Sequence, residues 1–182
     1  MPASIQPGRS AQICTAVRRP LLVSVVIGSS ISLMDAGTVT LRLALPSAFW
    51  WSFLPVLEIV ALFAASPAAR RAGAWPLTID RFFRGHGPSL LWLVVLAACC
   101  AYIPTPTLYA WPARDRVFLW AGCVAIVWSA ALDFRFFHGG LKQNVWRAAR
   151  DLLLQRCIAW SVGVTLFVGA AAYQTIATRL GL

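Results

Sequence analysis

Hydrophobic and polar positions are arranged in long blocks along this chain. Five blocks are almost free of charge, at residues 20–41, 49–66, 88–103, 117–132 and 157–178. A helix needs about 20 apolar residues to cross the roughly 30 Å hydrocarbon core of a bilayer, and fewer where flanking aromatic and arginine side chains reach the interface. The pattern therefore predicts an all-α fold, a polytopic integral membrane helical bundle with about five transmembrane helices.

The first part of the chain leaves two points open. Residues 20–66 also fit one re-entrant element, which would give four spans in place of five. Residues 1–19 have no helical periodicity, so we expect a disordered cytoplasmic tail before a single helical membrane domain over 20–182. Leu21–Leu33 is preceded by two arginines, as in a signal peptide, but no small-x-small cleavage site follows; we expect a retained signal anchor.

Composition supports the membrane prediction. The chain is 59% hydrophobic and 12% charged, with mean hydropathy +0.71, whereas soluble domains carry about 25% charged residues. The net charge of +10 would suit nucleic acid, but the basic residues form short clusters between apolar blocks, so we expect no nucleic-acid partner. Five cysteines without a CxxC spacing indicate free thiols.

The basic residues predict an orientation, because cytoplasmic loops retain Lys and Arg. Counting them in alternate segments places twelve on one side and four on the other. We therefore expect a bacterial cytoplasmic (inner) membrane protein with its N-terminus inside and its C-terminus outside. The twelve are Arg9, Arg18, Arg19, Arg70, Arg71, Arg81, Arg84, Arg135, Lys142, Arg147, Arg150 and Arg156, and the four are Arg42, Arg114, Arg116 and Arg179.

Two basic segments next to predicted spans have apolar residues at helical spacing. In Leu141–Arg156 these are Leu141, Val145, Ala148 and Leu152, and the shorter Leu77–Arg84 is similar. Both predict amphipathic helices on the cytoplasmic leaflet, where arginine stems are buried and their charged tips stay hydrated. The residues expected to contact anionic lipid headgroups are Arg81, Arg84, Arg135, Lys142, Arg147 and Arg150.

The same two regions share a set of residues. Asp80–Gly87 and Asp133–Gly139 each contain an Asp, a Phe-Phe pair beside Arg, then His and Gly. Aromatic rings and arginines both favour the headgroup layer, which is a sufficient reason for the likeness. PLTIDRFFRGHGPSLLWL and LDFRFFHGGLKQNVWRAARDLL resemble segments that enter or join spans in a loose group of bacterial multi-pass membrane proteins of unknown function. The resemblance implies a helical membrane fold and no activity.

Acidic residues inside predicted spans are candidates for function, because each is costly there unless paired or hydrated. Asp35 and Glu58 lie roughly 10 and 14 Å below the turn at Arg42, at 1.5 Å per residue, so they could meet across the first helical hairpin with Arg42 compensating one of them. This arrangement predicts a proton- or cation-linked site. The alternative is a buried polar contact that fixes helix register.

Other candidates are a pair of histidines and two faces of small residues. His86 and His138 both lie at the predicted cytoplasmic edge, where two imidazoles could hold a metal or haem. Gly28 lies on the polar face of the first span, and Ser161, Thr165 and Gly169 recur every four residues in the last; both patterns are typical of close helix packing. No P-loop, GxSxG, HExxH or paired Cys/His zinc pattern occurs, so we name no catalytic residue.

These features lead to a ranked set of functions. The first is a non-catalytic accessory or scaffolding subunit of a membrane complex, which contacts anionic lipid through its arginines and other membrane subunits through its small-residue faces. The second is a small proton- or cation-linked transporter or channel component that uses Asp35 and Glu58. A membrane-embedded enzyme or a haem carrier is third, and we expect no cofactor.

Overall fold

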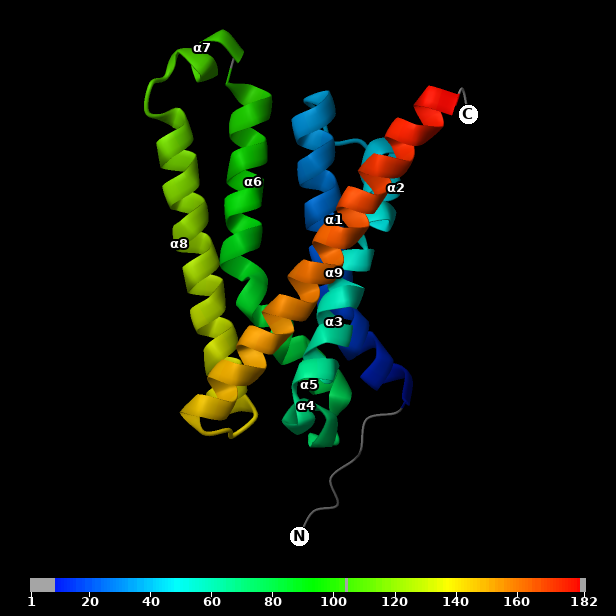
Figure 1. The fold of residues 1–182 in the computed structure, drawn as a ribbon, viewed down its shortest axis with the longest axis vertical. Coiled ribbons are helices and arrows are strands. Elements are labelled where there is room, and N and C mark those ends of the chain that lie inside the picture. Colours follow the sequence, from blue (N-terminus) through cyan, green and yellow to red (C-terminus); the bar gives the residue numbers. More distant parts are fainter. Residues whose placement is uncertain (1–8, 104, 181–182) are drawn as a thin grey trace.

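The structure, a computed structural model, describes residues 9–103 and 105–180 (Figure 1). Within these residues every regular element is helical. Five helical segments are long and apolar enough to cross a membrane, at Ile13–Ala36, Leu41–Ala65, Trp75–Tyr102, Arg114–Gly140 and Val145–Gly169. The predicted all-helical fold and the five apolar segments are thus confirmed, while residues 1–8 of the expected tail lie outside the described residues.

The first two segments form a helical hairpin. α1 (Arg9–Ala36) is followed by α2 (Leu41–Trp51) and α3 (Phe53–Ala65), which are separated at Ser52. α1 and α2 approach closely at Gly28, where an added Cβ would lie 2.6 Å from the Cα of Ala48. The small residue therefore allows direct backbone contact. Each segment, Ile13–Ala36 and Leu41–Ala65, is long and apolar enough to cross a membrane by itself, which favours five segments over one re-entrant element.

Residues 9–19 differ from the expectation. They belong to α1, whereas the sequence suggested a disordered tail throughout 1–19. The physical reason is that Ile13, Ala16 and Val17 extend the helical spacing of the apolar block, and Ala16 is buried in the core.

The remaining segments are longer than their apolar blocks. α4 (Pro67–Arg71) leads into α5 (Trp75–Phe82), the 3₁₀ turn η1 (Phe83–His86) and α6 (Gly87–Tyr102). After the short α7 (Thr105–Ala110), α8 (Arg114–Arg135) ends in a π-helical turn, η2 (Phe136–Gly140). α9 (Val145–Leu180) is a single helix of 36 residues. The expected surface helix at Leu141–Arg156 therefore begins at Val145 and is continuous with the last apolar segment.

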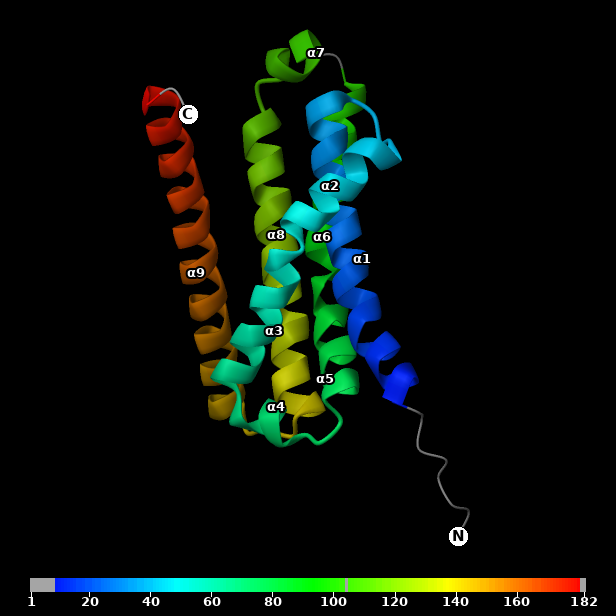
Figure 2. The ribbon, with the colours of Figure 1, turned by 90° about the vertical axis from the view of Figure 1, so that its right-hand side faces the viewer.

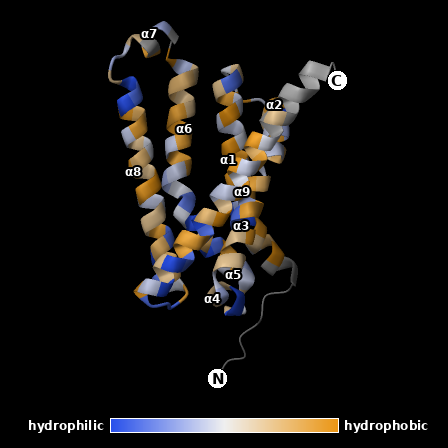
Figure 3. Ribbon diagram, in the orientation of Figure 1, coloured by the Kyte–Doolittle hydropathy of each residue, from blue (hydrophilic) through white to orange (hydrophobic). Residues whose placement is uncertain are grey.

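The long helices run between two ends of the molecule (Figures 1 and 2). We call the end that holds the start of α1, α4, α5, η2 and the start of α9 the basal end. The distal end holds α7, the turn between α1 and α2, and the end of α9. The end of α8 and the start of α9 lie close together at the basal end, and the two helices diverge toward the distal end. Hydrophilic residues gather at the basal end, while the helix shafts are mostly apolar (Figure 3).

The core lies at the basal end. Four phenylalanines from α5, η1 and η2 are its largest members, and aliphatic residues of α1, α3, α4 and α9 complete it. α1 also packs against α5 and α6, α6 against α8, and α3 against α9. The buried core residues are Ala16, Val23, Leu62, Ala69, Ile79, Phe82, Phe83, Phe136, Phe137 and Ala148.

Candidate functional site: a buried charge cluster at the basal end

The two similar segments of the sequence pack against each other. Phe82 of α5 is fully buried, and its ring lies edge-on to Phe136 of η2 at a centroid distance of 5.6 Å and to Phe137 at 6.5 Å. Edge-to-face pairs of this kind add to the free energy gained by burying the rings. The sequence favours the headgroup layer for these aromatic residues, whereas the structure places them in the protein core, where they pack against one another.

The close packing of these segments depends on Gly85. The residue lies in η1 and is buried, and a Cβ added to it would collide with Oδ1 of Asp133 near the end of α8. Asp133 is 0% exposed, and Oδ1 has no hydrogen-bond partner among the described residues. The absence of a side chain at Gly85 thus leaves room for a buried carboxylate between η1 and α8.

The other oxygen of this carboxylate binds an arginine from α9. The Arg156 guanidinium donates a hydrogen bond to Oδ2 of Asp133, and its second terminal nitrogen lies 3.4 Å from Oε1 of Glu58 on α3. The neighbouring Gln155, which is fully buried, donates its amide to Oε2 of Glu58. We call Glu58, Asp133 and Arg156 the Arg156 triad. It connects α3 to α8 and α9, which lie much later in the sequence.

A histidine with unpaired nitrogens lies near the triad. The His86 ring stacks on Phe83 at 4.9 Å and meets Phe82 edge-on at 5.2 Å. Both ring nitrogens are buried and lack a hydrogen-bond partner among the described residues. Arg156 is close enough to His86 to act on it electrostatically.

The second histidine has different surroundings. His138 is exposed, stacks on Phe134 at 5.9 Å, and its Nδ1 lies 2.7 Å from the backbone oxygen of Gln143. In the described part of the chain, no three His, Cys, Asp or Glu side chains gather as metal ligands would. The hypothesis that His86 and His138 hold a metal or haem therefore gains no support from their placement.

Two further carboxylates at the basal end have their own partners. Asp80 pairs with Arg19 of α1 at 2.5 Å and with Arg84 at 3.2 Å. Asp151 pairs with Arg150 at 2.7 Å, and a glutamine amide donates a 2.8 Å bond to the same carboxylate. Each of these carboxylates has at least one arginine that it does not share with another acid.

The predicted pair of Asp35 and Glu58 is not brought together. Asp35 is exposed near the distal end of α1 and, among the described residues, takes part in no ion pair; Arg42 is exposed at the start of α2. Glu58 instead pairs with Arg156 and Gln155. Sequence reasoning missed this pairing. One signal was available: Arg156 directly precedes the last apolar block, and a charged side chain at the edge of a membrane-spanning segment is costly without a partner.

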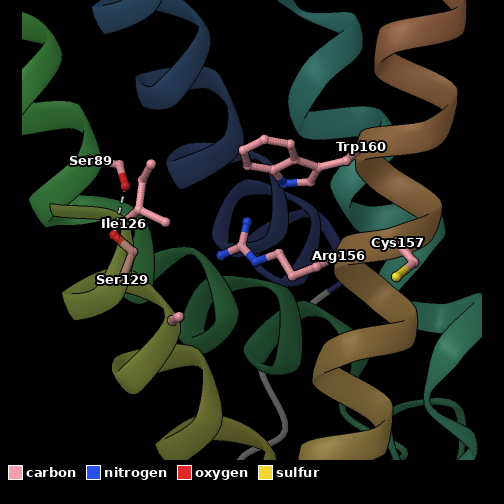
Figure 4. A pocket seen from close by; sticks show the side chains of 7 residues that line it. Ser89, Ile126, Ser129, Arg156, Cys157 and Trp160 are labelled. Carbon is pink, nitrogen blue, oxygen red and sulfur yellow. Dashed lines mark hydrogen bonds between the residues drawn. The ribbon is translucent and has the colours of Figure 1, made fainter. Parts of the chain in front are cut away.

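Two cavities adjoin the triad on either side of α9. One of about 330 Å³ lies between α6, α8 and α9, and Arg156 and Trp160 project into it opposite Ser89 and Ser129, whose hydroxyls are 2.7 Å apart (Figure 4). The other, of about 220 Å³, lies between α3 and α9 and is lined in part by Glu58 and Gly163. Two members of the triad therefore face cavities, whereas Asp133 lines neither of them.

The remaining predicted contact residues are at the surface, with one exception. Gly28 is buried against α2, as a packing role requires. Ser161, Thr165 and Gly169 are exposed on α9. The residues expected to contact lipid headgroups are all exposed: Arg81, Arg84, Arg135, Lys142, Arg147 and Arg150.

The apolar positions of the amphipathic segments pack mostly on the protein core: Ala148 is buried, and Leu141 and Leu152 are partly buried against it. In α9 the buried positions are Ala148, Asp151, Gln155 and Ala159, so two polar side chains face the protein while Val145 is exposed. In α5 the apolar residues Ile79 and Phe82 are buried, but against the protein core. The two polar residues have partners there: Gln155 donates to Glu58 of α3, and Asp151 accepts from Gln143, in the connection between η2 and α9.

Comparison with known proteins adds no assignment. No protein-family model, curated protein or solved structure matches this chain.

Proposed function

We propose that this chain is an integral protein of the bacterial inner membrane with five spans, and that it acts as a non-catalytic accessory or scaffolding subunit. Its last helix would bind a helix of another membrane subunit. The observation that carries the proposal is the uncovered distal half of α9. The buried stripe on this helix ends at Ala159, and from Trp160 to Gly169 no described residue is buried.

The uncovered face has the residues that helix pairs use in membranes. Gly163 faces Leu57 of α3, with an added Cβ at 3.8 Å. At 3.6 residues per turn, Ser161 and Thr165 lie about 160° around the helix from Gly163, on the side away from α3. The Thr165 hydroxyl donates a 2.7 Å bond to the backbone oxygen of Ser161. The face therefore has only short side chains, and its threonine hydroxyl already has a hydrogen-bond partner within the helix. Both properties suit close contact with a second helix in lipid.

The placement in the membrane rests on apolar length and on basic residues. Five apolar helical segments fit the thickness of a bilayer, and the segments with most Lys and Arg lie at the basal end. The positive-inside bias would put the basal end in the cytoplasm. The exposed arginines there would contact anionic headgroups, each contributing about 1 kcal/mol near the surface.

The transporter alternative is not favoured by a specific observation. It required Asp35 and Glu58 to form one site, and Glu58 instead binds the side chains of α9. Asp35 is exposed near the distal end of α1.

A photo-crosslinking amino acid tests the proposal in the native membrane. Incorporated at Thr165, it should give a discrete adduct with one partner at constant stoichiometry. Incorporated at Phe167, which is 67% exposed and points elsewhere around the helix, it should give lipid adducts only. Thr165→Leu should abolish co-purification of the partner in mild detergent and Phe167→Leu should not. Equal crosslinking from the two positions would contradict the proposal.

A further inference from the structure

The Arg156 triad has one more acid than base. Glu58 and Asp133 share a single guanidinium, whereas Asp80 has two arginines and Asp151 has Arg150. The other groups that face the triad are Gln155 of α9, which is neutral, and His86 of η1. With both carboxylates ionised and the imidazole neutral, the cluster would carry an excess negative charge. Such a charge between apolar helices is costly unless a cation balances it.

The space around Asp133 limits which cation can balance the excess negative charge of the triad. Its Oδ1 faces Gly85 so closely that not even a methyl group fits, and it has no hydrogen-bond partner in the described part of the chain. A metal ion needs several ligands at about 2.0–2.6 Å, and none of the described clusters of His, Cys, Asp and Glu has three members. A proton alone requires no added volume. We propose that the Arg156 triad is a proton-binding site in which Glu58 and Asp133 share one exchangeable proton.

The proton is placed on the carboxylates and not on the imidazole. His86 packs against the rings of Phe82 and Phe83 and lies within electrostatic reach of Arg156. An imidazolium there would put a second buried cation beside the guanidinium, and the two like charges would repel each other. Glu58 and Asp133 bind the same guanidinium, and Glu58 is close enough to Asp133 to act on it electrostatically. Ionising both carboxylates costs the repulsion between them, which favours a shared proton.

Glu58 is the group through which the proton exchanges. It lines the cavity between α3 and α9, and its side chain is 17% exposed, whereas Asp133 is 0% exposed. The site goes beyond the proposed scaffolding role and does not depend on it, because Arg156 is the only triad residue on α9 and lies in its basal half, whereas the partner face is in the distal half.

Infrared difference spectroscopy on the full chain in lipid nanodiscs tests this site. Carboxyl groups with ordinary pKa values near 4 are ionised at about pH 7. A C=O stretching band of a protonated carboxyl at that pH therefore shows that one carboxyl group has kept its proton. The wild-type protein should show one such band, which disappears on titration to alkaline pH. The band should shift on isotope labelling of aspartate or of glutamate, since the two residues share the proton.

Variants identify the groups. Asp133→Asn and Glu58→Gln keep the side-chain volume, and each should remove the whole band. Asp80→Asn is the matched control, because that carboxylate has two arginines, and it should leave the band unchanged, as should His86→Gln. If one variant does not fold, the band in the other variant and its isotope shift in the labelled wild-type protein still test the proposal. A folded wild-type protein without the band, or a band that survives both Asp133→Asn and Glu58→Gln, would overturn the proposal.

Discussion

Gly85 of η1 and Asp133 of α8 are in direct contact, and the contact exists only because Gly85 has no side chain. Gly85→Ala would place a methyl group against a buried carboxylate that is already held by Arg156. The backbone of η1 or the end of α8 would have to move. We expect a loss of about 1–3 kcal/mol in the free energy of unfolding, measured by thermal or denaturant unfolding in a constant detergent.

Gly87 is the matched control for this substitution. It begins α6, two residues beyond Gly85, and an added Cβ would meet nothing within 4 Å. Gly87→Ala should cost clearly less than Gly85→Ala, because its Cβ meets no atom and only the restriction that Pro88 places on a helical residue before it opposes the change. Equal losses from the two substitutions would mean that general helix strain, and not the Asp133 contact, is responsible.

The helices of this protein could be read from the sequence because their signal is local. An apolar block marks a helix without reference to any other part of the chain, which is why the five segments were found. The ends were less accurate: Ile13 and Ala16 extend α1, and Val145 begins α9, because a helix continues through polar residues when the protein gives them contacts.

The partners within the site could not be read in the same way. Glu58 is 98 residues from Arg156. The sequence instead suggests a meeting with Asp35, with Arg42 compensating one of the two acids, because the first hairpin brings these residues near one another. The sequence shows that an acidic residue in an apolar segment needs a basic partner. It does not show which of the sixteen basic residues the fold brings to it. The Phe82 region had the same ambiguity, because an aromatic and arginine-rich segment fits both a headgroup layer and an aromatic core.

The pairing of Arg156 with Asp133 should dominate the stability of the contact between α8 and α9. Arg156→Gln would leave a fully buried carboxylate without its cation. Removing one partner of a buried ion pair costs about 3–5 kcal/mol, so we expect a large fall in the unfolding midpoint. Combining Arg156→Gln with Asp133→Asn should restore part of the loss, since the variants act on one interaction.

Arg147 provides the comparison for this experiment. It is exposed on the same helix, and its side chain has no ion-pair partner among the described residues. Arg147→Gln should change the unfolding free energy by less than about 0.5 kcal/mol. A double variant no more stable than Arg156→Gln alone would show that the two residues are not energetically coupled.

The aromatic contacts at the basal end should be the main apolar contribution to folding. Phe82 is 0% exposed and touches rings from η1 and η2, so Phe82→Ala removes a full set of packed contacts and leaves a cavity. The expected loss is about 3–5 kcal/mol. Phe49 is 81% exposed, and Phe49→Ala should be nearly neutral by the same unfolding assay.

The proposed topology has five crossings, so the two termini lie on opposite sides of the membrane, whereas four crossings would place them on the same side. α1 begins at the basal end and α9 runs to the distal end (Figure 1). If the basal end is cytoplasmic, green fluorescent protein fused to the N-terminus should fluoresce and alkaline phosphatase fused to the C-terminus should be active. A phosphatase fusion after Arg71 should be inactive and one after Trp111 active, because these positions lie in connections at opposite ends. An inactive C-terminal fusion beside a fluorescent N-terminal one would require an even number of crossings, and would place part of α1 to α3 or α9 on the membrane surface.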